Sequence, residues 1–252
     1  MKKSFGLLQT CTFILPFISA PAYPGMMQSL TQNAPLVASL SIAPAWHTGG
    51  RSQTKTLQED ITKHYADTSS QNTIAQGEFF LGREYVLNNT FRAQLGGAVE
   101  LTSNARLRGD IWEDADPDFN NYYYQYNVNH AHIALKGKLL ADVPSKWNVT
   151  PYIGASAGVG FNRASDYLIT PKIFQEIPSP PFAPKTKTSF TYTLEAGMQK
   201  TLTAHTSAGI GYVFSDWGQT SLSRAPNQTL GTGLQTNHLY TNGLQLSLNY
   251  HA

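Results

Sequence analysis

Polar and apolar residues alternate almost strictly between positions 91 and 107 of the chain. One set of alternate positions carries Phe91, Ala93, Leu95, Gly97, Val99, Leu101, Ala105 and Leu107. The other set carries Arg92, Gln94, Gly96, Ala98, Glu100, Thr102, Asn104 and Arg106. A period of two predicts a β-strand with two chemically different faces. The run of about 17 residues exceeds the about 9–11 residues with which a tilted strand crosses a membrane.

Seven further segments have the composition or alternation of strands. With the segment 91–108 they give eight predicted strands: 36–46, 74–87, 91–108, 124–140, 149–163, 188–200, 206–215 and 238–250. Short connections at 88–89, 142–146 and 201–205 alternate with long polar ones at 47–73, 109–123, 164–187 and 216–237. Short turns on one side and long loops on the other are typical of outer-membrane barrels. The sequence therefore predicts an all-β fold, an eight-stranded antiparallel up-and-down transmembrane β-barrel with a filled polar lumen.

The composition fits a protein that crosses a membrane with strands. Charged residues make up 13% of the chain, which is about half the usual share. The mean hydropathy is −0.29, and beyond the N-terminus no apolar run approaches the roughly 18 residues that a membrane helix needs. Alternating strands give only a weak hydropathy signal, so these values are compatible with a barrel.

The N-terminus has the pattern of a secretory signal peptide. Lys2 and Lys3 precede a mostly apolar segment at 5–18, and Ala20-Pro21-Ala22 supplies small residues around a cleavage site. We expect a signal peptide at 1–22 and a barrel domain at 23–252. Cleavage removes the single cysteine and leaves 16 of the 18 Lys and Arg residues against 16 Asp and Glu residues. Without a cysteine the expected mature chain cannot form a disulfide framework, and its balanced charges give no basic field that would attract nucleic acid.

Ionisable residues fall on the strand faces that also carry glycine, which marks those faces as the crowded interior. The predicted lumen charge network consists of Glu78, Glu84, Arg92, Glu100, His132, Lys136 and Glu195. An eight-stranded barrel is just wide enough for its own side chains, and buried charges need partners. We therefore expect paired charges that fill the lumen; a gated ion path is the alternative. Our assumed turn centres set Glu84 opposite Arg92, Lys136 opposite Gly154 and Glu195 opposite Gly209.

A soluble barrel would have the reverse arrangement, with its apolar face inside. Aromatic residues near strand ends favour the membrane, because they would form interfacial girdles; they are Trp46, Tyr85, Phe91, Phe161, Phe190 and Tyr250. Tyr122, Tyr124 and Tyr126 conflict with this facing, since Ile133 and Leu135 mark the odd positions of their strand as lipid-facing. Either a bulge near 127 switches the phase, or these tyrosines lie above the membrane.

The C-terminal segment has a polar residue, a glycine and two apolar residues at fixed spacing, followed by an aromatic: Thr241, Gly243, Leu246, Leu248 and Tyr250. It resembles the C-terminal β-signal of bacterial outer-membrane proteins, which implies insertion by the outer-membrane assembly machinery. With the stretches 77–85, 152–160 and 209–214, the chain resembles the small OmpA-like and opacity-type surface antigens. This resemblance implies an eight-stranded barrel in the outer membrane of a Gram-negative bacterium.

Three further patterns are candidate sites. His130 and His132 have a spacing that suits a metal, but no third ligand accompanies them in the sequence, so we expect lumen packing, no metal and no cofactor. Asp114, Asp116 and Asp118 resemble the start of a calcium loop without its glycine and closing glutamate. A solvated acidic loop is expected there, with divalent bridging to lipopolysaccharide as the alternative. For an enzyme, His64 with Asp60 or Asp67 is the nearest arrangement.

We expect a non-catalytic outer-membrane protein with a structural or surface-interaction role, in adhesion or membrane integrity. The alternatives are a small pore or channel, a soluble periplasmic ligand-binding barrel, and a rim-sited outer-membrane hydrolase. The expected partners are outer-membrane lipids including lipopolysaccharide, the assembly machinery, and a host or surface ligand bound by the loops.

Overall fold

The computed structural model describes residues 34–48, 50–69, 72–143, 148–174 and 177–252. The expected signal peptide lies outside these residues. Among them, the only helical element is a 3-10 turn, η1 (Pro117–Phe119), and no helix is long and apolar enough to span a membrane. The strands are β1 (Leu36–His47), β2 (Gln53–Gln58), β3 (Ile61–Asp67), β4 (Thr73–Val86), β5 (Phe91–Thr102), β6 (Ala105–Glu113), β7 (Asn120–Ala141), β8 (Val149–Pro171), β9 (Lys185–Thr201), β10 (Thr206–Asp216), β11 (Thr220–Ser221), β12 (Gln235–Thr236) and β13 (Tyr240–His251).

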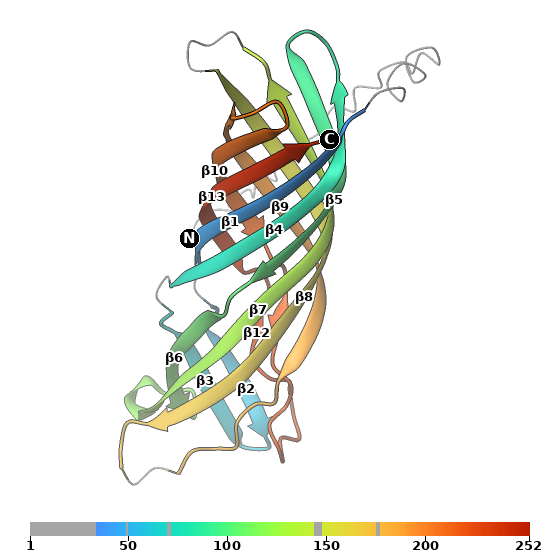
Figure 1. Cartoon of the computed structure of the whole chain (residues 1–252). Helices are drawn as coiled ribbons and strands as arrows, with labels where there is room; N and C mark the ends of the chain where they lie inside the picture. The colour runs from blue at the N-terminus through green and yellow to red at the C-terminus, as the bar shows by residue number, and fades with distance from the viewer. Residues whose placement is uncertain (1–33, 49, 70–71, 144–147, 175–176) are drawn as a thin grey trace, which may run out of the picture. The chain divides into compact units, whose positions relative to one another are not determined.

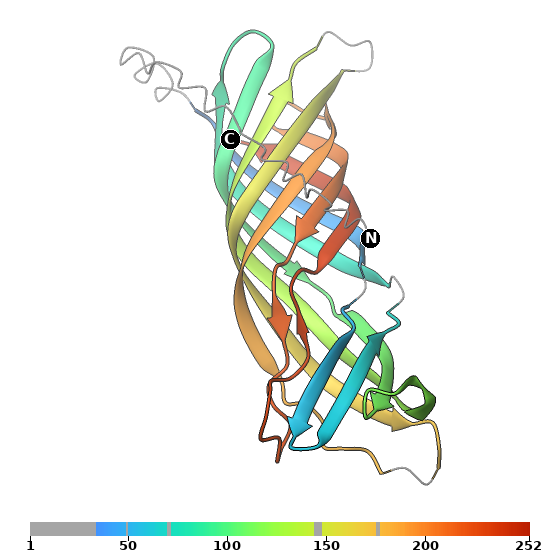
Figure 2. The same cartoon turned by 180° about the vertical axis from the view of Figure 1, so that it is seen from behind.

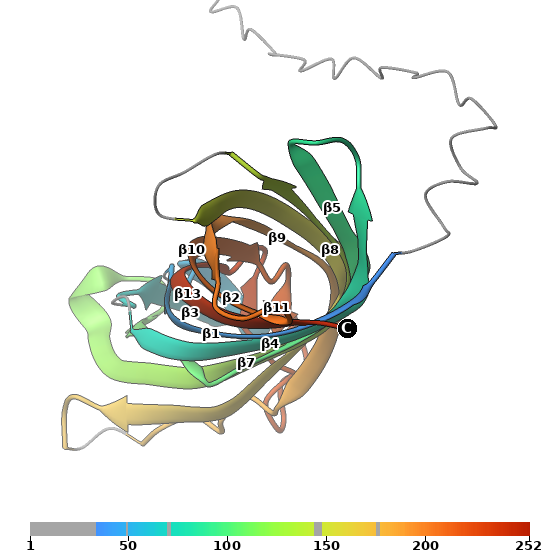
Figure 3. The same cartoon turned by 45° about the horizontal axis from the view of Figure 1, so that its top comes forward.

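Eight antiparallel strands close into a ring (Figures 1 and 3). Their order is β7-β5-β4-β1-β13-β10-β9-β8, and β8 pairs back onto β7. The β1–β13 pairing joins the first and last strands of the ring, with Ile42 opposite Leu246. Closure leaves no open edge in the ring, which hydrocarbon requires of any spanning sheet. The predicted eight-stranded barrel is confirmed.

The exterior of the ring is apolar. Leu95, Val99 and Leu101 are 51%, 44% and 62% exposed, whereas Glu100 between them is 2% exposed. The same outward-facing band continues around the ring through Leu40, Ile42, Phe79, Leu81, Ile133, Leu135, Ile153, Val159, Phe190, Leu194, Met198, Ile210, Leu244, Leu246 and Leu248. Only lipid tolerates such a continuous apolar exterior around a polar interior. The chain is therefore a transmembrane barrel, and the soluble alternative is wrong.

At one end, the wall of the barrel continues beyond the apolar band as an extension. Strand β6 pairs with the first part of β7, β3 pairs with β6, and the β2–β3 hairpin forms the edge (Figure 2). Strands β7 and β8, with 22 and 23 residues, run through both parts. The long connections enter at this end, so it is the external one. The segments predicted as long loops at 47–73, 109–123 and 164–187 are thus partly strands.

The extension has an apolar core of its own. It contains Leu57, Tyr65, Leu107, Ile111, Tyr122, Tyr124, Tyr126, Tyr167, Phe182, Trp217, Leu222, Leu234 and Leu239, all buried. These residues come from all four long connections and the strands beside them. Their burial in a common core explains why the segments are ordered, because aromatic side chains bury large areas on packing.

The strand face that points inward reverses between β5 and β6. Glu100 points inward in β5, and Leu107 is buried in β6 while Arg106 and Arg108 are exposed. The prediction that Ala105 and Leu107 lie on the outer face is therefore wrong. Two residues outside either strand, at 103–104, separate the two phases. On the periplasmic side of this break the strand is surrounded by lipid, and its apolar side chains face outward. On the external side it is surrounded by water, and its apolar side chains face inward.

The tyrosines of β7 do not require such a reversal. Even positions of β7 face inward along the whole strand, from Tyr122 to Leu140. A bulge does occur, but in β8, where Asp166 has a φ of 57° and the register with β7 shifts. Tyr122, Tyr124 and Tyr126 lie above the apolar band and point into the core of the extension. The second of the two explanations for these tyrosines is confirmed.

Our registers for three hairpins were wrong by an even number of residues. Glu84 pairs with Gln94, Lys136 with Ser156 and Glu195 with Val213. All three turns are centred one or two residues further along the chain than the assumed centres; in the first, Leu87 N donates to Phe91 O across the connection. A shift by two or four keeps every side chain on its face. The inward facing of the charged residues therefore survives although their neighbours change.

Candidate functional site in the barrel lumen

Lys136 of β7 lies at the centre of the lumen between two carboxylates. Its Nζ lies 2.5 Å from Glu78 Oε1 of β4 and 2.9 Å from Glu195 Oε2 of β9. All three side chains are at most 6% exposed. Three strands that are not neighbours in sequence are thereby joined across the interior.

Lys138, two residues further along β7, extends this group. Its Nζ is 3.6 Å from Glu195 Oε1 and lies over the ring of Tyr152 at 4.4 Å from the centroid. Gly154 is paired with Glu195, and a Cβ atom at Gly154 would lie 2.5 Å from Glu195 Oε1. A side chain at position 154 would therefore require the Glu195 side chain to shift.

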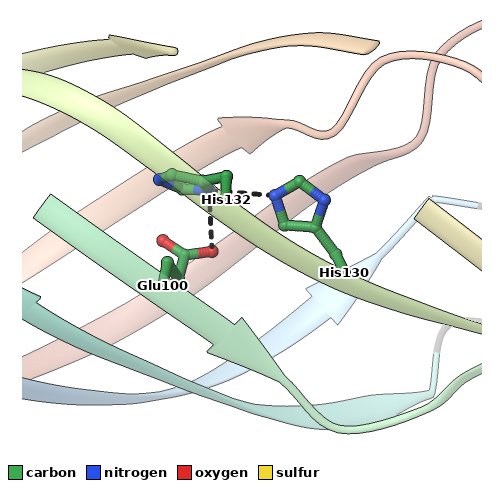
Figure 4. A group of neighbouring side chains, drawn as sticks. All are labelled: Glu100, His130 and His132. Carbon is green, nitrogen blue, oxygen red and sulfur yellow. Dashed lines mark hydrogen bonds and ion pairs between the residues drawn. The ribbon is translucent and has the colours of Figure 1, made fainter. Parts of the chain in front are cut away.

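A second group lies next to the first, nearer the external end (Figure 4). His132 Nδ1 is 2.9 Å from His130 Nε2 and 3.9 Å from Glu100 Oε1. His130 Nδ1 is 2.6 Å from Asn162 Oδ1, and its ring stacks on Trp217 with centroids 4.8 Å apart. We had expected no third ligand beside the two histidines. The structure supplies one, Glu100, because β5 pairs with β7 and sets Glu100 opposite His132.

A third group lies toward the periplasmic end. Arg92 donates to Glu84 Oε1 at 2.7 Å and, through Nε and Nη2, to both oxygens of Asp142 at 2.6 and 2.7 Å. Gln94 Nε2 donates to Glu84 Oε2 at 2.7 Å. The Arg92 guanidinium holds the pKa of Asp142, which lies in the turn after β7, below its usual value.

All seven predicted lumen residues are inward-facing or at the lumen mouth, and they form these three groups. The predicted charge network did not include the contact partners Lys138, Asn162, Trp217 and Asp142. Lys138 was detectable from its even position in β7. The contacts of Asn162 and Trp217 with His130 depend on the strand register and on how the last long connection folds. Neither of these can be read from the local sequence pattern.

The central lumen is filled by side chains. A cavity of about 10 Å³ lies beside Gln76, Glu78, Glu100 and Gln245. This is about the volume that a single water molecule needs. The described side chains around Lys136 are therefore closely packed and cross-linked by ion pairs.

The residues of the expected β-signal lie in β13, which pairs with β1 and β10. Thr241 is buried, and Leu246, Leu248 and Tyr250 face the lipid. A Cβ atom at Gly243 would lie 3.0 Å from the Cβ of Ala45, so this glycine allows close packing. Recognition by the assembly machinery stays a prediction.

The two external candidates, His64 of the expected enzyme arrangement and the acidic segment around Asp116, make local contacts. His64 Nδ1 is 2.8 Å from Thr54 Oγ1, and its ring lies 4.6 Å from Trp112. Asp116 caps η1 by accepting from Asp118 N at 3.0 Å. A His–Asp pair that we did not predict lies at the lumen rim: His238 Nδ1 is 2.8 Å from Asp216 Oδ2.

No protein-family model matches the chain, and no curated protein matches its sequence. Solved structures do match it. Neisserial surface protein A is 11% identical over 86% of this chain and 97% of its own, with a TM-score of 0.43. OprG from Pseudomonas aeruginosa is 11% identical over 87% and 97%, with a TM-score of 0.46. The protease OmpT from Escherichia coli is 9% identical over 86% and 97%, with a TM-score of 0.45.

These structures are outer-membrane proteins, and their similarity to this chain concerns the fold alone. The ring closure, the outward apolar band and the alternation of short and long connections are those of a bacterial outer-membrane β-barrel of the Gram-negative type.

Proposed function

We propose that this chain is a surface-interaction protein whose external extension presents a rigid contact surface. The observation that carries the proposal is the buried aromatic core of the extension. Tyr65 lies 5.7 Å from Tyr124 and from Phe182, and Tyr167 lies 5.0 Å from Phe182, between ring centroids. Burial raises the pKa of the Tyr65 hydroxyl well above its ordinary value. A surface held by such a core loses little conformational entropy on binding.

The outer face of the extension carries a hollow that suits a ligand. Its volume is about 340 Å³, and its lining includes Arg108 of β6, Tyr123 and Gln125 of β7, and Leu168 of β8. Ligand sites commonly begin at about 300 Å³ and combine apolar walls with a few polar groups. Arg108 in this lining, together with Lys172, whose Nζ lies 4.3 Å from the centroid of the Tyr123 ring, suits an anionic group on a host or neighbouring cell. In this proposal the chain belongs with the small OmpA-like surface antigens, and lipopolysaccharide surrounds the base of the extension.

The test is adhesion of bacteria that express the chain to cultured host cells. We expect adhesion to fall when Arg108→Ala and Tyr123→Ala are combined, because both side chains are exposed and removing them leaves the core intact. The matched control is Arg83→Ala, which lies at the other end of the barrel. Equal surface expression is checked by heat-modifiable gel migration. Adhesion that is unchanged by the double variant would contradict the proposal.

A hydrolase is the second candidate, and the pair Asp216–His238 favours it. The Asp216 side chain is 5% exposed and the His238 side chain 55% exposed, so a buried carboxylate orients an accessible imidazole. This is the arrangement that orients a general base in hydrolases. Turnover of labelled peptides or lipid A that is lost in Asp216→Asn would support it.

The filled lumen gives a small pore less support. Planar-bilayer recordings test the pore role: a pore requires steady conductance by the unmodified barrel.

A further inference from the structure

We propose that Glu100, His130 and His132 form a binding site for a first-row divalent transition metal ion inside the barrel. One ligand atom from each residue lies within 4.8 Å of the other two, and all three residues are buried. His130 and His132 project from the same face of β7, and Glu100 projects from the neighbouring strand β5 toward them (Figure 4). Two rigid paired strands therefore hold all three side chains.

Among the described residues, no lysine or arginine lies within ion-pair distance of Glu100. Lys136 contacts Glu78 and Glu195, and Lys138 contacts Glu195. Among the residues that the structure describes, Glu100 Oε1 has no hydrogen-bond partner, and its ion-pair contact is His132 Nδ1 at 3.9 Å. A buried carboxylate is costly unless it is paired or coordinates a metal. A divalent cation between Glu100 and the histidines supplies the missing charge.

The groups behind His130 prepare its Nε2 atom to bind a metal. Asn162 Nδ2 donates to the carbonyl oxygens of Trp217 and Gln219 at 2.6 and 2.8 Å, which fixes Asn162 Oδ1 as the atom that faces His130. The His130 Nδ1 atom, 2.6 Å from this oxygen, must therefore carry the hydrogen. Its Nε2 atom is left with a lone pair that points at the cluster. Such a carboxamide or carboxylate behind a ligating histidine is usual at metal sites.

The two histidines are already near the spacing of metal ligands, whereas the Glu100 carboxylate must move closer, because the three ligand atoms span up to 4.8 Å. Two ligands about 2.0–2.1 Å from a tetrahedral ion are about 3.3 Å apart. The two histidine nitrogens are 2.9 Å apart, and Glu100 Oε1 is 3.9 Å from His132 Nδ1. Glu100 also lines the cavity of about 10 Å³, so its side chain is not packed tightly on every side.

The ligand set selects the class of metal. Two imidazoles and one carboxylate suit Zn²⁺ and its first-row neighbours, whereas Ca²⁺ and Mg²⁺ prefer oxygen ligands alone. The metal replaces the hydrogen bond between His130 and His132, and His132 must then carry its hydrogen on Nε2. Bound in this way, the ion cross-links β5 to β7 at the level where the lumen meets the extension.

The test is Zn²⁺ binding to the full-length barrel refolded in detergent, with the metal present during refolding so that the buried site fills. We expect one Zn²⁺ per chain after removal of free metal, a higher melting temperature with Zn²⁺, and with Co²⁺ the visible absorption of a low-symmetry site. Glu100→Gln should weaken Zn²⁺ binding at least tenfold while keeping the side-chain volume. Asn162→Ala, behind His130, should weaken it about 10–100-fold.

His64→Asn is the matched control, because His64 lies on β3 in the extension and has no contact with the cluster. It should leave the binding of one Zn²⁺ unchanged. His132→Gln should also weaken Zn²⁺ binding. If this variant fails to refold, Glu100→Gln and the Co²⁺ spectrum of the unmodified chain still decide between binding and no binding. The proposal is overturned if the refolded barrel retains no Zn²⁺, or if retention survives Glu100→Gln.

Discussion

Replacing Lys136 with methionine tests the idea that the lumen is a sealed network. The variant removes two ion pairs at 2.5 and 2.9 Å and leaves Glu78 facing Glu195 without the lysine between them. Removing one partner of a buried pair typically costs about 3–5 kcal/mol, because the other charge stays buried. Lys138 remains 3.6 Å from Glu195 and offsets part of that carboxylate's loss. We therefore expect a loss of about 3–5 kcal/mol, most of it from Glu78.

The assay is urea unfolding of the barrel refolded into lipid vesicles, followed by tryptophan fluorescence and by heat-modifiable gel migration. The double variant Glu78→Gln/Lys136→Met restores the balance of charges and should recover most of the lost stability. A methionine in place of lysine keeps the volume, so cavity formation contributes little. Lys200→Met, which changes an exposed lysine at the periplasmic end of β9, is the control.

The refuting result is a small effect. If water filled the lumen, the carboxylates would be solvated, and Lys136→Met would cost no more than the about 1 kcal/mol of an exposed ion pair. A double variant that is as unstable as the single one would equally refute the pairing.

Three further outcomes are expected. Asp142→Asn should cost less than about 1 kcal/mol, because the pair with Arg92 is partly exposed. The Arg92 guanidinium lowers the folded-state pKa of Asp142 below its ordinary value of 3.8, so the stabilisation by this pair is present above that pH and is lost as the pH falls through the lowered pKa. Unfolding midpoints measured between about pH 2 and 5 should lose this dependence in the variant. Tyr124→Ala should destabilise the extension by about 3 kcal/mol and leave the ring intact. Trypsin should then cut at Lys55 faster on intact cells, while heat-modifiable gel migration stays normal. Cleavage as slow as in the unmodified chain would mean that the aromatic core does not hold the β2–β3 hairpin. Leu135→Arg, at an outward position that is 64% exposed, should cost about 2–4 kcal/mol in vesicles, and an unchanged unfolding midpoint would show that this face does not meet the bilayer centre.

The ring was predictable because period-two alternation determines which residues share a face. Glu100 inside and Leu101 outside follow from the pattern alone, and the ends of the eight predicted strands mostly lie within a few residues of the observed ones on the periplasmic side. Register was not predictable, because the length of each turn sets it. The shift that pairs Glu84 with Gln94 leaves the facing intact, so the pattern contains no signal that would detect it.

The extension escaped prediction for a different reason. Alternation defines two faces, but it does not say which face is inside. In β7 the inward positions change from Tyr122, Tyr124 and Tyr126 to His130 and Lys136 without any change of phase. The apolar face of an alternating strand thus points outward where the barrel lies in lipid and inward where the sheet lies in water.

The ring has a polar interior and the extension an apolar one, and the break at 103–104 marks the change from one to the other. Within the lipid, the side chains outside are apolar, so the polar ones must be buried and must neutralise one another, as Lys136 does with Glu78 and Glu195. Above the lipid, water solvates Arg106 and Arg108 outside, and the interior is free to be apolar. Strand β7 meets both demands by changing residue type, whereas β5 and β6 meet them by reversing their facing. The two interiors rely on different interactions. Substitutions in the apolar core of the extension should therefore alter surface presentation, and substitutions in the polar lumen should alter barrel stability, with little effect of either on the other property.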